Sequence, residues 1–201
     1  LAGSKQAFNK YLDAYYANER FGGPSVYFHK KVIARIRQSD YEGLFTDEHF
    51  IEYIYATLAS WGMHRMGPKG SKMRNFEDFK DSIQTNRSTF LELHKFTIEK
   101  LTNDDKKVVY PMLELLMDNI DVMQSESKLV GSSKVIHHLL PDLVPPIDRE
   151  YTLRFFYGDL TSKYTPLFQK DEESNLFIEI VGYFQNICDK LQLDEGDCDK
   201  T

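Results

Sequence analysis

Residues 129–152 read LVGSSKVIHHLLPDLVPPIDREYT, and this stretch decides the fold of the chain. Gly131 predicts a tight turn, because glycine adopts backbone angles that other residues avoid. Ser132 or Ser133 then caps a short helix, since a serine hydroxyl accepts a hydrogen bond from a free amide at a helix start. Pro141 ends this helix, because proline cannot continue it.

The second half of the stretch predicts an extended crossing and a new helix. Val144 and Pro145 each precede a proline, which keeps both residues out of the helical region. Asp148 caps the next helix, which we expect from Arg149 to Tyr157. The predicted order is therefore turn, short helix, extended segment and capped helix.

This order of residues resembles the motif of the helix-hairpin-helix DNA glycosylase superfamily. In the resemblance Gly131 matches the hairpin glycine, and Lys134 stands where bifunctional members carry their nucleophilic lysine. Asp148 matches the catalytic aspartate, and Arg154 and Gly158 match residues that often follow it. The resemblance covers about 30 of the 201 residues and implies an all-α fold with a helix-hairpin-helix core.

The segment also departs from that superfamily in three ways. Ser132 and Ser133 replace the glycine-containing hairpin whose amides approach a phosphate. Asp148 follows Lys134 by 14 residues, a shorter spacing than the family usually has, and no cysteine cluster for an iron–sulfur site follows. The segment is more similar to a set of uncharacterised prokaryotic proteins that share Ser-Lys, a nearby His, Pro-x-Leu-x-Pro and an Asp.

Lys134 and Asp148 are the candidate catalytic residues. Lys134 is expected in the first turn of its helix, where the helix dipole favours the neutral amine that a Schiff-base nucleophile needs. Asp148 serves as base or electrostatic stabiliser if a pocket shifts its pKa. The structural alternatives are a solvated Lys134, a Lys134–Asp148 ion pair, and an Asp148 that only caps its helix.

Neighbouring aromatic and histidine side chains are assigned packing roles. His137 and His138 follow Lys134 by three and four residues, so one of them shares its helical face. Two adjacent histidines do not easily bind one metal ion, and we expect no metal site and no cofactor. Trp61 ends an apolar stripe, which predicts a place in the core.

Composition indicates one domain over residues 1–201, with the motif in residues 125–160. Hydrophobic residues make up 41% of the chain and aromatic residues 13%, enough for a sizeable core. The two cysteines are too few for a disulfide framework. With no long apolar run and no signal-peptide pattern, we expect a soluble, cytoplasmic protein that does not enter a membrane.

Charge is uneven along the chain, although its net value is −6. Residues 1–37 carry a net charge of +5, and residues 61–74 carry four basic side chains and no acidic one. Such asymmetry permits DNA as a partner at one surface. The candidate phosphate ligands are Lys69, Lys72, Arg74, Lys134 and Arg149.

Apolar residues recur at helical spacing over most of the chain, which predicts an all-α, single-domain helical bundle. Thr46 is expected to start a helix whose apolar stripe runs from Phe50 to Trp61. This helix and the last long one are expected to pack against the motif segment. The other expected helices are an early one that includes residues 11–17 and those over 26–37, 76–83, 88–101, 104–120 and 175–193.

Three functions remain open from the sequence. The first is a nucleic-acid-binding module with a glycosylase-like fold. The second is an enzyme of the glycosylase or lyase type, in which Lys134 attacks and Asp148 stabilises a developing cationic sugar. The third is an interaction protein that keeps the fold without chemistry. The target base, the choice between DNA and RNA, and the oligomeric state stay open.

Overall fold

The computed structural model describes residues 4–17, 23–64, 72–125, 128–158 and 172–193, and these are helical with no strand among them. The expected all-α class is therefore confirmed. The helices are α1 (Lys5–Ala17), α2 (Pro24–Gln38), η1 (Gly43–Thr46), α3 (Glu48–Ser60), α4 (Phe76–Thr85), α5 (Arg87–Leu93), η2 (Ile98–Lys100), α6 (Asn103–Asn119), α7 (Leu129–Leu139), η3 (Arg149–Leu153), α8 (Arg154–Tyr157) and α9 (Glu173–Leu191).

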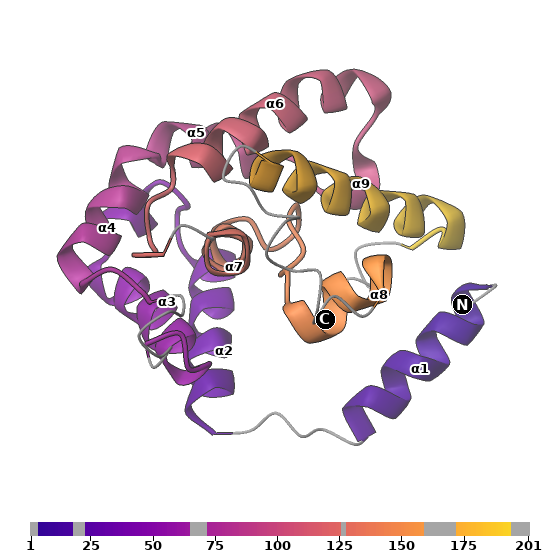
Figure 1. Cartoon of the computed structure of the whole chain (residues 1–201), viewed down its shortest axis with the longest axis horizontal. Helices are drawn as coiled ribbons and strands as arrows, with labels where there is room; N and C mark the ends of the chain where they lie inside the picture. Colours follow the sequence, from indigo (N-terminus) through magenta and orange to yellow (C-terminus); the bar gives the residue numbers. More distant parts are fainter. Residues whose placement is uncertain (1–3, 18–22, 65–71, 126–127, 159–171, 194–201) are drawn as a thin grey trace.

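Helix α7 occupies the centre of the fold and is seen nearly end-on in Figure 1. It packs against α2, α3, α6 and α9. Nine of its 11 residues are buried, so α7 is a core helix on almost every side. The expected packing of the motif segment against the helix before Trp61 and against the last long helix is confirmed.

The start of α7 differs from the expectation. The helix begins at Leu129, so Gly131 lies inside its first turn and forms no hairpin. A Cβ built on Gly131 would lie 2.5 Å from the Met123 sulfur. The glycine therefore serves a close approach between α7 and the segment before it. Ser132 and Ser133 are both buried within the helix and do not cap it.

Glu173 from α9 supplies the cap that the serines were expected to provide. Its Oε2 accepts hydrogen bonds from the Lys128 amide at 2.8 Å and the Leu129 amide at 3.1 Å. A carboxylate at a helix N-terminus also suits the helix dipole. The Ser132 amide, by contrast, donates to the Lys128 carbonyl at 2.8 Å within the helix. Because α7 begins at Leu129, Lys134 lies in its second turn and not in the first turn as expected.

Several other helices begin or end one or more residues from the position that the sequence predicts. The Asp47 carboxylate, not Thr46, caps α3 by accepting from the Phe50 amide. Thr102 caps α6 in a reciprocal pair with Asp105. The helix expected over 88–101 ends at Leu93 and is followed by the short turn η2.

Trp61 is not a core residue, contrary to the expectation. The stripe of α3 is buried as far as Leu58, but Trp61 is the C-cap residue and only partly buried. Gly62 then takes a positive φ of 81°, which turns the chain away from the helix axis. The indole is therefore placed beside the core, where it meets α7.

No helix in the described ranges is long and apolar enough to cross a lipid bilayer.

Candidate functional site

Lys134 and Asp148 converge, one from the buried helix α7 and the other from the start of η3. The Lys134 Nζ lies 3.2 Å from Asp148 Oδ2. The lysine side chain is 11% exposed and the aspartate side chain 39%. The pair thus has a buried cationic partner and an anionic partner that faces solvent. This is the ion pair that the sequence left open as a structural alternative.

Asp148 is held in place by its own backbone and by Thr152. Its Oδ1 accepts a hydrogen bond from the Tyr151 amide at 3.4 Å, so the carboxylate also caps η3 as expected. The Asp148 amide donates to Thr152 Oγ1 at 3.1 Å. The Asp148 carbonyl accepts from both Thr152 and Leu153, which gives η3 its wide π-helical turn.

Trp61 covers the lysine. The Lys134 Nζ lies 5.1 Å from the centre of the Trp61 ring, within the range of a cation–π contact. The same indole lies 5.4 Å from the His138 ring. Sequence reasoning missed this role, although Trp61 follows directly after a helix and is the only tryptophan of the chain.

Three histidines lie together under this site, and two of them, His29 and His138, share a hydrogen bond. His138 donates from Nδ1 to the Lys134 carbonyl at 2.6 Å, because a carbonyl oxygen only accepts. Its Nε2 lies 3.2 Å from His29 Nδ1. The His137 Nδ1 donates to the Val144 carbonyl at 2.7 Å, and the His29 and His137 rings are stacked. Sequence reasoning did not select His29.

Burial keeps the cluster uncharged at neutral pH. Burial is the main cause that lowers the pKa of His138 well below its usual value, and His137 adds to it. Burial also lowers the pKa of His137 to about 4. The pKa of His29 is lowered first by burial and then by the charge of Lys30. Among the described residues, no three or more His, Cys, Asp or Glu side chains gather in a way that could hold a metal ion.

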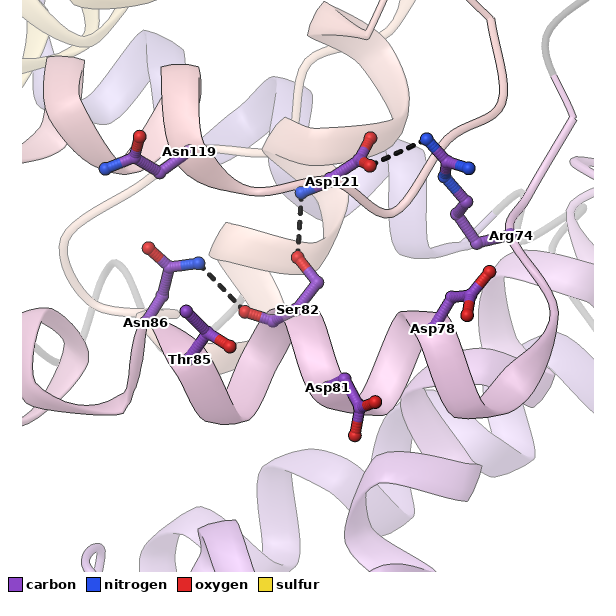
Figure 2. Close-up of a pocket in the computed structure, with 8 residues that line it drawn as sticks. All are labelled: Arg74, Asp78, Asp81, Ser82, Thr85, Asn86, Asn119 and Asp121. Atoms are coloured by element: carbon purple, nitrogen blue, oxygen red, sulfur yellow. Dashed lines mark hydrogen bonds and ion pairs between the residues drawn. The ribbon is translucent and has the colours of Figure 1, made fainter.

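Arg74, another candidate phosphate ligand, lies apart from this pair and is itself bonded to a carboxylate. Arg74 donates to Asp121 at 2.7 Å and lines a pocket of about 470 Å³ between α4 and the end of α6. Figure 2 shows the Arg74 guanidinium turned toward Asp121, with Asp78 and Asp81 along the α4 side of the pocket. Three carboxylates line this pocket, so its charge opposes a phosphate.

The remaining candidate phosphate ligands lie on loops and helix starts. Lys72 is exposed at the start of the segment that precedes α4, and Arg149 is exposed in the first position of η3. Lys69 lies outside the described residues. Their role toward DNA stays a prediction.

No family model, no curated protein and no solved structure matches this chain.

Proposed function

We propose that this protein is an enzyme of the glycosylase or lyase type that acts on DNA, with Lys134 as nucleophile and Asp148 as its charged partner. The observation that carries the proposal is the 3.2 Å approach of Lys134 Nζ to Asp148 Oδ2 in a site covered by Trp61. These are the two residues that the sequence resemblance assigned to chemistry. They come from separate elements, and the fold brings them together.

The chemistry follows from the environment of the two groups. The Lys134 ammonium gives up a proton, which the departing base takes up, and the neutral amine attacks C1′ of the target sugar. The bond from C1′ to the base breaks, and the base leaves. Asp148 then offers a negative charge to the sugar as positive charge develops on it. The Lys134 side chain is only 11% exposed, so its amine is held in one place beside Asp148.

The burial of Lys134 also argues against a role that is limited to binding the DNA backbone. A lysine that binds the DNA backbone must reach a phosphate in solvent, and the exposed position of Lys72 meets that requirement. Lys134 instead points at a carboxylate from within the core, with its side chain 11% exposed. A substrate must therefore come to this amine, which a flipped nucleotide does.

The decisive test is to trap a covalent adduct with borohydride on duplex DNA that contains an abasic site. We expect an adduct with the wild-type protein and none with Lys134→Ala. We expect Asp148→Asn to slow its formation by roughly 100-fold. Lys128→Ala is the matched control, because Lys128 is a partly buried lysine that pairs with Asp121 at 2.7 Å.

A monofunctional glycosylase would form no adduct, so release of a damaged base is measured in parallel. Binding to abasic, undamaged and single-stranded DNA is measured by fluorescence anisotropy. Binding with neither an adduct nor base release would reject the enzyme and leave the nucleic-acid-binding module. No binding to any of these DNAs would reject both and leave the interaction protein.

A further inference from the structure

We propose that His29 and His138 are positioning residues that hold Trp61 over the Lys134 amine. The inference rests on the proposed function and adds two residues to that site. The contacts run in one chain, from His29 on α2 through His138 on α7 to Trp61 at the end of α3. They join three helices at the place where Lys134 meets Asp148.

The hydrogen bonds fix the direction of each ring. Since His138 uses Nδ1 to donate to the Lys134 carbonyl, a neutral His138 ring has its lone pair on Nε2. His29 must then donate from Nδ1 to that nitrogen, across 3.2 Å. The His29 hydrogen therefore locks the orientation of the His138 ring, which is completely buried.

Trp61 needs such a support because it lies beyond the regular turns of α3. The C-cap residue has left the helix, and the positive φ of Gly62 follows at once. The His138 ring, 5.4 Å away and tilted by 50°, gives the indole a fixed surface to pack on. The indole also contacts Lys134, whose Nζ lies 5.1 Å from the centre of the Trp61 ring.

The neutral state of the cluster is part of this role. The groups that face His138 are Lys134 and His137 on its own helix and His29 on α2, with Lys30 acting on His29. A charged His138 ring would repel the Lys134 ammonium and would place a hydrogen where His29 already donates. An uncharged His138 leaves Asp148 as the charged partner of Lys134.

The test compares two substitutions of His29. His29→Asn keeps an amide donor near the position of Nδ1, whereas His29→Leu has similar bulk and no donor. His49→Asn is the control, because His49 is an exposed histidine of α3 bonded to Glu52. Trp61 is the only tryptophan, so its emission reports this site alone. The second readout is the rate at which the borohydride-trapped adduct forms.

We expect His29→Leu to shift the Trp61 emission to longer wavelength and to slow adduct formation by roughly 10- to 100-fold. His29→Asn should restore both values toward the wild type. Unchanged emission and rate in His29→Leu would overturn the inference, and so would an equal loss in both variants with folding intact. If the wild type forms no adduct, the proposed function fails, and the emission alone decides whether His29 positions Trp61.

Discussion

Residue 131 has no room for a side chain larger than hydrogen, although it lies in a helix. We predict that Gly131→Ala destabilises the protein by about 1 to 2 kcal/mol, because the new methyl group would sit 2.5 Å from the sulfur of buried Met123. Alanine favours a helix over glycine by about 1 kcal/mol, so the clash outweighs the gain. The free energy of unfolding in urea measures the effect.

The same substitution in a Met123→Ala background should change sign. With the methionine side chain removed, Gly131→Ala is expected to stabilise the variant by about 1 kcal/mol through helix propensity. A destabilisation of equal size in both backgrounds would show that Met123 is not the neighbour that requires glycine. Measuring Gly131→Ala in the two backgrounds thus distinguishes an effect of close packing from an effect of backbone conformation.

His137 makes the stability of the protein fall in mild acid. Its pKa is about 4 in the folded protein against 6.5 in an exposed histidine, mainly because of burial. Stability is therefore complete above pH 6.5 and is lost as the pH falls from 6.5 toward 4, because the unfolded chain takes up the proton first. Between pH 7 and pH 5 we expect the free energy of unfolding to drop by about 2 kcal/mol from this residue.

His137→Asn tests the pH effect, because the asparagine amide can still donate to the Val144 carbonyl. The drop in the free energy of unfolding between pH 7 and pH 5 should shrink by about 2 kcal/mol in this variant. Urea unfolding at the two values of pH measures it. The same drop in both proteins would mean that His137 takes up its proton equally in the folded and unfolded states.

A residue of the candidate site could be predicted from the sequence where the residues that define its role lie close to it in the chain. Lys134 and Asp148 could be selected because both lie in one short segment with a recognisable order of turn, helix and cap. His29 could not, because its partner His138 lies 109 residues away and nothing near His29 marks it. Trp61 was selected but given the wrong role, since its apolar stripe ends one turn earlier than the sequence pattern suggests.

At the scale of elements, helix α7 depends on a cap that comes from α9. We predict that Glu173→Ala lowers the free energy of unfolding by about 2 to 3 kcal/mol, because the buried carboxylate accepts from the amides of Lys128 and Leu129. Glu173→Gln keeps one oxygen acceptor and should cost about 1 kcal/mol. Urea unfolding of the three proteins compares them.

Glu172→Ala is the matched control, since Glu172 is the exposed neighbour of Glu173. It should change the free energy of unfolding by less than about 0.5 kcal/mol. If Glu173→Ala behaves like this control, the N-terminus of α7 does not depend on the carboxylate. If Glu173→Ala lowers the free energy of unfolding more than Glu173→Gln does, the oxygen acceptor of residue 173 is the group that stabilises the helix start.

The helices α6 and α7 show which helix ends can be predicted from the sequence. The start of α6 was expected within about two residues, because its cap is made by Thr102 and Asp105, three residues apart. The start of α7 was placed after Gly131, because a glycine and two serines are typical of a turn and a cap. Its real cap, Glu173, follows Leu129 by 44 residues, so no local pattern contains it.

For the whole molecule, the distribution of charge limits how DNA is held. The chain carries a net charge of −6, so binding must rely on a few local cations. Arg74 is paired with Asp121, and Lys134 is paired with Asp148. The sequence also gives Lys69, Lys72 and Arg149 as candidate phosphate ligands.

Three such contacts predict a shallow dependence of DNA affinity on salt. Each phosphate neutralised contributes about −0.9 to the slope of log K against log salt, so we expect a slope near −3 for an abasic duplex. Lys72→Ala should reduce the steepness by about 1, whereas Arg74→Ala should leave the slope unchanged. Fluorescence anisotropy at four or more salt concentrations measures each slope. A wild-type slope of −6 or steeper would require further cations, and a decrease in Arg74→Ala would mean that DNA displaces Asp121 from the arginine.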